Sequence, residues 1–163
     1  MADSLYFLLL GSNQGNRLDQ LFNAAAKIEY QIGQISAHSS IYQTEPWGNS
    51  DQPFFLNQAL KVKSQLIPTE ALRIFQSIEL EMGRTRLTKW GARTIDIDIL
   101  YWDDQIINLP KLIIPHPQIQ HRKFTLMALA EIAPDFIHPI LQRTNEQLLV
   151  ACKDDLSVTR FRD

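Results

Sequence analysis

The stretch TIDIDILYW at residues 94–102 is the part of the sequence that decides the fold. Successive side chains of a β-strand point to opposite faces, so its three isoleucines are expected on one face and Asp96 and Asp98 on the other. An apolar face of this kind has to be covered by other parts of the chain. The stretch therefore predicts a strand with one face in the protein interior and one acidic face.

The two aspartates predict either a metal site or a solvated strand face. Residues two apart on a strand are separated by roughly 6.5–7 Å, and carboxylates at that spacing can converge on cations about 3.5–4 Å apart, as in two-metal sites. Aspartate is uncommon in strands, and like charges on one face repel each other. From this strand alone both alternatives stay open. If a metal binds, oxygen ligands without cysteine favour Mg²⁺.

A basic stretch directly precedes the strand. Arg84, Arg86, Lys89 and Arg93 lie within ten residues that contain no acidic side chain. By itself such a stretch is usually a solvated loop. Beside two carboxylates, it is the layout expected where Mg²⁺ and arginines act on a transferring phosphate, because the planar arginine side chain binds phosphate oxygens in pairs. The combination favours phosphoryl transfer.

The patterns on either side complete a strand, helix, strand, strand, helix, strand order. This βαββαβ order is typical of ferredoxin-like α+β domains. Here it is followed by an added hairpin, in which a turn at residues 103–105 leads to a short strand at 106–107, and by C-terminal helices. The last dozen residues are expected to be weakly ordered. The predicted strands cover residues 5–10, 35–41, 54–62 and 94–102, and the predicted helices 18–32, 68–82, 124–132 and 145–151.

Length and composition restrict the possible functions. The chain has 163 residues, 45% of them apolar, and a net charge of −2, which predicts a single globular domain over residues 1–163 and no nucleic-acid partner. The longest apolar run, residues 5–10, is too short to span a bilayer. Cys152 is the single cysteine, so no internal disulfide can form. Without a secretion signal or membrane partner, we expect a cytoplasmic protein.

Several other positions allow both a binding and a structural interpretation. Asn57 can pair with the edge of a heterocycle while Phe55 stacks on its face, yet both are also ordinary strand residues. His116, between two prolines, can donate to a phosphate, although a lone histidine is more often structural. The GSN sequence at residues 11–13 matches neither a dinucleotide-binding nor a Walker A pattern, so a turn is its expected role.

Taken together, these motifs resemble one family, the 6-hydroxymethyl-7,8-dihydropterin pyrophosphokinases of folate synthesis. The resemblance covers a core from about residue 5 to about residue 150, and WGARTIDIDI at residues 90–99 is its most specific part. The other matching stretches are LLLGSNQGN at 8–16, YQTEPWGNSDQPFFLN at 42–57, IELEMGR at 78–84 and IPHPQIQHRKFTLMALAEIAP at 114–134.

The resemblance implies a ferredoxin-like fold and the transfer of pyrophosphate from ATP to the hydroxymethyl group of the pterin, with release of AMP. It also implies that Asp96 and Asp98 bind two Mg²⁺ ions and that Arg84 and Arg93 act on the phosphates. Separately, we expect the protein to be a monomer. The implied nucleotide-binding residues are Gln76, Glu79, Arg86, Trp90, Ile99, Lys111, His116 and Arg122. The implied pterin-binding residues are Thr44, Glu45, Trp47, Phe55, Asn57 and Phe124.

The sequence departs from the family pattern at a few positions. Phe55 stands where some members have tyrosine, Trp47 where leucine is common and Ala92 where proline is common. The loop from Arg86 to Trp90 is one residue shorter than in some members, which bears on how it closes. None of these changes removes a group that the chemistry requires.

Two other functions stay open on the residues alone. A non-catalytic module of this fold could bind a small molecule or RNA, although RNA binding favours aromatic side chains on the sheet and a basic surface. A metal phosphohydrolase could use the same two aspartates to activate water. Analysis of the products formed from ATP separates these functions from pyrophosphate transfer.

Overall fold

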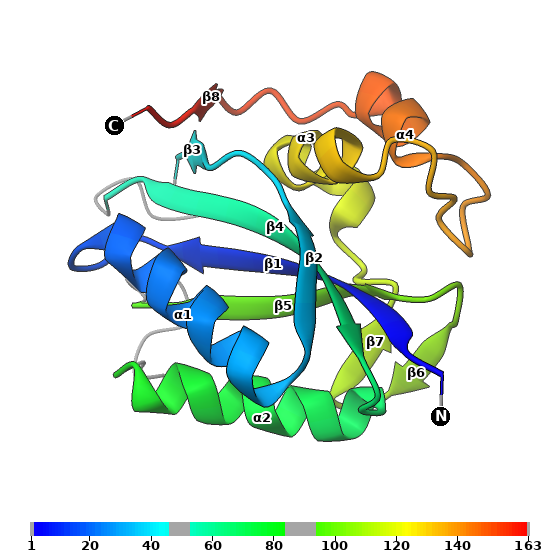
Figure 1. The fold of residues 1–163 in the computed structure, drawn as a ribbon. Helices are drawn as coiled ribbons and strands as arrows, with labels where there is room; N and C mark the ends of the chain where they lie inside the picture. Colours follow the sequence, from blue (N-terminus) through cyan, green and yellow to red (C-terminus); the bar gives the residue numbers. More distant parts are fainter. Residues whose placement is uncertain (1, 46–52, 84–93, 163) are drawn as a thin grey trace.

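The computed structural model describes residues 2–45, 53–83 and 94–162, which form an antiparallel sheet with helices on both faces (Figure 1). The strands are β1 (Ser4–Ser12), β2 (Gln34–His38), β3 (Tyr42–Thr44), β4 (Phe55–Ser64), β5 (Asp96–Trp102), β6 (Ile107–Leu109), β7 (Leu112–Ile114) and β8 (Val158–Arg160). The helices are α1 (Arg17–Gln31), α2 (Pro68–Glu81), α3 (Lys123–Ile132) and α4 (Asn145–Ala151), with a 3₁₀ turn η1 (Ile119–His121) before α3.

Strand β1 lies inside the main sheet, between β4 and β5. It pairs antiparallel with β4 along one edge and with β5 along the other. The order continues as β5-β1-β4-β3-β8, and β2 pairs with the other half of β4. Strands β6 and β7 form a separate two-stranded sheet. The predicted strand over residues 35–41 is thus divided into β2 and β3, which lie one after the other along the same edge of β4.

The two faces of β1 pack into different apolar clusters. Tyr6, Leu8 and Leu10 are buried against α1 and α2 together with the isoleucines of the β5 region. Phe7 and Leu9 point to the opposite face and pack against α3 and α4. Figure 1 shows these two helix pairs on opposite sides of the sheet. Alternate side chains of β1 therefore lie in two different apolar cores. Asp96 and Asp98 of β5 lie on the same face of the sheet as α3.

Local signals set the helix starts as predicted. The side chain of Asn16 accepts a hydrogen bond of 3.1 Å from the backbone N–H of Asp19, which caps α1. Pro68 occupies the first turn of α2, where no helical hydrogen bond from its nitrogen is needed. No helix within the described ranges is long and apolar enough to cross a bilayer.

The predicted hairpin after β5 is wrong in its pairing. Asp103 stays bound to the start of β1, because its carboxylate accepts from the Leu5 N–H at 2.8 Å and its own N–H donates to the Leu5 oxygen at 2.8 Å. Ile107 then pairs with Ile114 of β7 instead of returning along β5. The turn at residues 110–111 brings β7 back beside β6, so the strand partner of β6 is the segment that directly follows it in the sequence.

The C-terminal residues are also more ordered than predicted. Residues 158–160 form β8, which pairs antiparallel with β3 at the edge of the sheet. The outer edge of β3 presents unpaired backbone groups that a returning chain can satisfy. Because such a partner lies more than 100 positions away in the chain, the local sequence carries no signal for it.

Candidate active site

Backbone pairing across three strands places Asp96 near Asn57, a residue predicted to bind the pterin. Gly11 of β1 is paired with Asp96 of β5 on one side and with Asn57 of β4 on the other. Two residues earlier, Leu9 is paired with Asp98. Directly opposed residues of a ladder point to the same face of the sheet. Asp96, Asp98 and Asn57 therefore face the same side, with the side-chain-free Gly11 between them.

Gly11 is required by the close approach of its neighbours. A Cβ atom at this position would lie 3.0 Å from the Asn57 Oδ1 atom and 3.7 Å from a ring carbon of Phe55. Asn57 in turn donates from Nδ2 to the Thr44 Oγ1 atom at 2.9 Å, and both side chains are buried. Three residues that the sequence predicts to bind pterin thus form one contact group at the end of β3 and β4.

The loop after β1 is held against the start of β4. Asn13 is buried and donates from Nδ2 to the Pro53 oxygen at 3.2 Å, and Arg17 donates to the Phe54 oxygen at 2.8 Å. The GSN sequence is therefore more than a turn, because Gly11 and Ser12 belong to β1. The signal for this was the glycine inside an otherwise apolar strand, which often marks a close backbone approach.

Glu79 positions the strand that carries the aspartates. Its side chain is only 4% exposed, and its Oε2 atom accepts a hydrogen bond of 2.9 Å from the backbone N–H of Ile97. Ile97 lies between Asp96 and Asp98, so the carboxylate ties α2 to the centre of the acidic stretch. Its predicted contact with the nucleotide stays a prediction, whereas the contact with Ile97 is structural.

His116 is held in a defined protonation state beside the acidic strand. The backbone N–H of His116 donates to the Leu100 oxygen at 2.9 Å, and the ring Nδ1 atom accepts from the backbone N–H of Gln118 at 3.1 Å. Burial, aided by the positive charge of Arg122 and opposed by Asp96, lowers the pKa of His116 to about 4. The ring is therefore neutral at pH 7, and its remaining proton sits on Nε2 as a hydrogen-bond donor.

A pocket of about 320 Å³ opens next to this histidine. It brings together four of the predicted site residues from β5, the β6–β7 turn and the segment before η1. That volume lies at the lower end of the range of small-molecule sites. The predicted residues in its lining are Asp98, Ile99, Lys111 and His116, and the others are Leu72, Ile97, Pro110, Leu112, Ile113 and Pro117.

Other predicted residues lie around this centre or outside the described part of the chain. Phe124 is 7% exposed and packs in the α3-side cluster with Leu9, the ladder partner of Asp98. Gln76 is exposed on α2, and Glu45 is half-buried just after β3. The predicted residues outside the described ranges are Trp47, Arg84, Arg86, Trp90 and Arg93.

Asp96 and Asp98 are the residues that could hold a cation. Within residues 2–45, 53–83 and 94–162, no group of three or more histidine, cysteine, aspartate or glutamate side chains is arranged to hold a metal ion. Two half-buried carboxylates are, however, a donor set that suits Mg²⁺, which keeps several waters and takes substrate phosphates as further ligands. The residues present therefore fit the metal that the sequence predicts.

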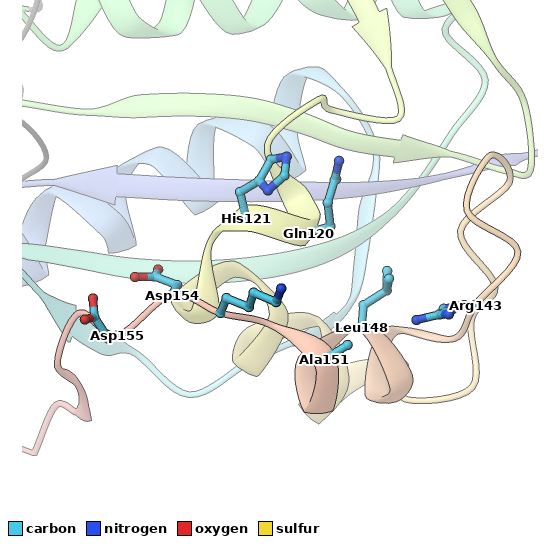
Figure 2. Close-up of a pocket in the computed structure, with 8 residues that line it drawn as sticks. Gln120, His121, Arg143, Leu148, Ala151, Asp154 and Asp155 are labelled. Carbon is cyan, nitrogen blue, oxygen red and sulfur yellow. The ribbon is translucent and has the colours of Figure 1, made fainter.

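A second pocket, of about 530 Å³, lies beside η1 and α4 (Figure 2). Basic and acidic side chains both line it, among them Arg143, Lys153 and Asp154. None of the predicted site residues contributes to its lining. It is therefore separate from the candidate active site.

Solved structures share this fold. The HPPK-DHPS protein of Plasmodium falciparum with pteroate superimposes with a TM-score of 0.76 at 19% identity, over 91% of this chain and 42% of that one. A further HPPK-DHPS structure in complex with substrates gives a TM-score of 0.76 at 15% identity, over 93% of this chain and 43% of that one. At these identities the likeness concerns the fold alone, and this chain spans less than half of those longer proteins.

Curated relatives define the class of protein as a pyrophosphokinase, an enzyme of the transferase class. A 2-amino-4-hydroxy-6-hydroxymethyldihydropteridine pyrophosphokinase of Aquifex aeolicus is 41% identical over 137 residues, which is 84% of this chain and 85% of the relative. The enzyme of that name from Bacillus subtilis is 43% identical over 131 residues, 80% and 78% of the two chains. A sequence model of one family matches residues 7–134. The chain belongs to the 7,8-dihydro-6-hydroxymethylpterin-pyrophosphokinase (HPPK) family.

Proposed function

We propose that this chain transfers the diphosphoryl group of ATP to the hydroxymethyl oxygen of 6-hydroxymethyl-7,8-dihydropterin and releases AMP. Membership of the family supports the reaction, and the ladder row at Gly11 is the observation that carries it to this chain. Asp96 and Asn57 lie on strands separated by β1, so their backbones are roughly 9–10 Å apart, twice the spacing of neighbouring strands. That distance suits a pterin held at Asn57 with its hydroxymethyl group directed toward phosphates at Asp96.

ATP is proposed to bind in the pocket beside His116. Ile99 offers an apolar contact for the base, and exposed Lys111 offers a positive charge. The neutral His116 ring can donate from Nε2 to a phosphate oxygen without a change of protonation near pH 7. Arg122, whose charge acts on His116, is proposed to face the same phosphates.

The pterin is proposed to bind on the same sheet face, at the end of β3 and β4. The Asn57 amide, oriented by its hydrogen bond to Thr44, would pair with the edge of the heterocycle, and Phe55 would stack on its face. Phe124 would contact it from α3. Glu45 follows Thr44 directly, and Trp47 is assigned to this side by the resemblance.

Asp96 and Asp98 are proposed to hold two Mg²⁺ ions. When bound, the ions would neutralise charge on the phosphates and lower the pKa of the attacking hydroxyl. The two aspartates would fix the position of this charge, and Glu79 would hold their strand through Ile97. Arg84 and Arg93, which the resemblance assigns to the phosphates, lie outside the described residues.

The proposed step exchanges one bond for another at the β-phosphorus. The hydroxymethyl oxygen forms a bond to that phosphorus, while the bond to the oxygen shared with the α-phosphate breaks. AMP leaves with that oxygen, and the hydroxyl proton passes to solvent. No side chain in the described part of the site is placed as a general base, so positioning of the two substrates carries most of the catalysis.

We also propose a fold class, a domain extent and an oligomeric state for the chain. The order β5-β1-β4, with β2 and β3 along the far edge, supports a ferredoxin-like core. The whole chain, residues 1–163 with a core over about 5–150, is proposed to be one domain. We propose that it acts as a monomer in the cytoplasm.

An ATP assay with and without the pterin tests the proposal. AMP formed only with pterin, Mg²⁺ and ATP together, in equal amount to a pyrophosphorylated pterin, is the expected result. Inorganic phosphate released without pterin would instead indicate a phosphohydrolase, and RNA binding without any turnover would indicate a binding module. Normal AMP release by Asp96→Ala would refute the role of the acidic strand.

A further inference from the structure

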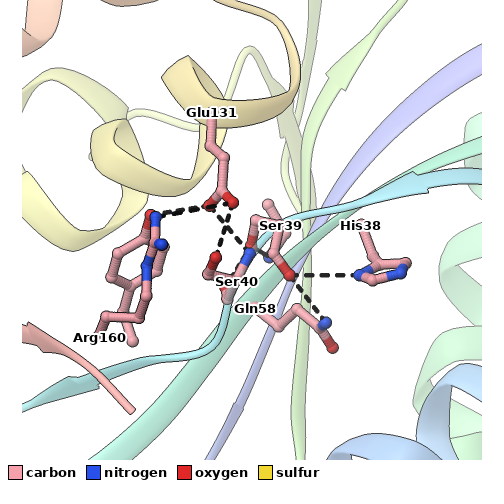
Figure 3. A network of polar contacts seen from close by, with 8 residues as sticks. His38, Ser39, Ser40, Gln58, Glu131 and Arg160 are labelled. Carbon is pink, nitrogen blue, oxygen red and sulfur yellow. Dashed lines mark hydrogen bonds and ion pairs between the residues drawn. The ribbon is translucent and has the colours of Figure 1, made fainter. Parts of the chain in front are cut away.

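Glu131 of α3 collects several hydrogen bonds from the segment that leads into β3. Its Oε1 atom accepts from the Ser40 N–H at 2.9 Å and from the Tyr42 hydroxyl at 2.7 Å. Its Oε2 atom accepts from the Ser40 hydroxyl at 2.7 Å. Figure 3 shows this carboxylate directed from the helix toward Ser40. One side chain thus fixes the position of α3 relative to β3.

The C-terminal strand supplies a cation to the same carboxylate. The Arg160 Nη2 atom lies 3.9 Å from the Glu131 Oε2 atom, and Figure 3 shows Arg160 approaching from the side of β8. Burial alone would raise the pKa of Glu131, but the hydrogen bonds from Ser40 and Tyr42 and the charge of Arg160 hold it below its ordinary value. Glu131 is therefore ionised near pH 7, the state in which both oxygens accept hydrogen bonds.

Strand β8 also holds β3 through its backbone. Val158 is paired with Thr44, and the Phe161 N–H donates to the Ile41 oxygen at 2.7 Å. Hydrogen-bonded and non-bonded pairs alternate in an antiparallel ladder, so Thr159, two residues before Phe161, is the next residue to exchange hydrogen bonds with β3. The Val158 side chain adds apolar contact with the cluster of β3, β4 and α3 residues.

The two elements joined by Glu131 carry opposite sides of the proposed pterin site. Strand β3 carries Thr44, which accepts the hydrogen bond of Asn57, and Tyr42 is the ladder partner of Asn57. Helix α3 carries Phe124 at its other end. A shift of β3 away from α3 would therefore change the separation of Thr44 and Phe124. The family model ends at residue 134, so β8 is a contribution from outside the matched part.

We propose that Glu131, together with Arg160 of β8, is a positioning residue for the pterin: it sets the distance between β3 and α3 and thereby the shape of the pterin site. This inference rests on the proposed function, since it assigns the pterin to Thr44, Asn57 and Phe124. Neither Glu131 nor Arg160 touches the nucleotide pocket. We therefore expect the larger effect on the pterin and only a small one on ATP, through Arg122 at the start of α3.

Steady-state kinetics of the full-length Glu131→Gln variant test the inference. The replacement keeps the size of the side chain but removes its charge and one accepting oxygen. We expect the KM for pterin to rise about 3- to 10-fold, because small displacements of binding groups have large effects, with the KM for ATP within about twofold of wild type. Glu146→Gln, an exposed glutamate on α4, is the matched control and should change neither constant.

A second variant tests the contribution of β8 separately. Thr159→Pro removes the backbone donor that faces β3, and Ser157→Pro places a proline just outside the strand as its control. Only Thr159→Pro should raise the pterin KM and speed amide hydrogen exchange of Gln43, the β3 residue paired with Thr159. If a thermal scan shows that Glu131→Gln is unfolded, Tyr42→Phe replaces it, since that change removes a single hydrogen bond to Glu131.

The outcomes separate the inference from the function on which it rests. A wild-type chain that makes no AMP from pterin and ATP would refute the proposed function. An active wild type with an unchanged pterin KM in folded Glu131→Gln and Thr159→Pro would refute the positioning role alone. An equal rise in both KM values would also refute it, because that result indicates a general loss of structure.

Discussion

Replacing Gly11 with alanine is expected to weaken pterin binding selectively. The new Cβ atom would lie 3.0 Å from the Asn57 Oδ1 atom, several tenths of an ångström inside ordinary contact distance. Asn57 is 4% exposed and packed between β1 and β3, so its amide can move only toward Thr44 or out of the sheet face. Either displacement disturbs the hydrogen bond of 2.9 Å that orients the amide.

The size of the effect follows from two opposing contributions. Inserting a methyl group into a packed site costs about 1–3 kcal/mol, whereas replacing glycine within a strand recovers about 0.5–1 kcal/mol of backbone entropy. The free energy of unfolding should therefore fall by about 0–2.5 kcal/mol. Loss of one well-oriented hydrogen bond to the substrate is worth about 0.5–1.5 kcal/mol, which corresponds to a rise of roughly 2- to 13-fold in the pterin KM.

Initial rates of AMP release, measured with each substrate varied in turn, check this prediction. Ser12→Ala is the matched control, because Ser12 is the next residue of β1 and faces the other side of the sheet. Its KM values should stay at the wild-type level, as should the ATP KM of Gly11→Ala. An unchanged pterin KM in a folded Gly11→Ala protein would show that Asn57 and Phe55 do not bind the pterin.

Three further predictions concern the metal, the strand support and a buried histidine. Asp98→Asn should lower AMP release on the order of 10²-fold, equivalent to about 3 kcal/mol of charge stabilisation, and shift the Mg²⁺ titration to higher concentration; an unaltered Mg²⁺ titration would argue against metal binding there. Glu79→Ala leaves the buried Ile97 N–H without its acceptor, so urea denaturation should report a loss of about 1–3 kcal/mol, and an unchanged midpoint would contradict the contact. Burial lowers the pKa of His138, so the stability it contributes is complete above the unfolded pKa of about 6.5 and falls as the pH drops below it. The variant His138→Asn keeps a hydrogen-bond acceptor without the titration, so urea unfolding at pH 7.5 and 5.5 should differ less for the variant than for wild type.

The sequence predicted those parts of the fold that depend on neighbouring residues. The alternation at 94–102 defined β5 and the face on which Asp96 and Asp98 lie, because strand periodicity is a local property. The hairpin after β5 and the order of the C-terminal residues were wrong, since both depend on which distant edge a strand finds. Ile107 pairs with Ile114 of β7, and β8 pairs with β3.

For the candidate site, too, the sequence identified residue types but not the contacts that depend on packing. Residue types and motifs identified the aspartates, His116 and Asn57 as candidates. They carried no information on the burial of Glu79 or on its bond to Ile97, because both depend on how α2 packs against β5. The role of Gly11 depends on the register of two ladders and became visible only with both partners in place.

Gly11 lies between β4 and β5, so the pairing of three strands would fix the spacing of the two substrates if Asn57 and Asp96 bind them as proposed. The interval between Asp96 and Asn57 is set by backbone pairing, so substitutions of apolar side chains in the core can accumulate without changing it. It can change only in steps of a whole strand or a shift in register. A pterin with a longer chain between its ring and its hydroxyl group would therefore place that hydroxyl at the wrong distance from the phosphates. Selectivity for the length of this chain would then come from the backbone spacing and not from a particular side chain.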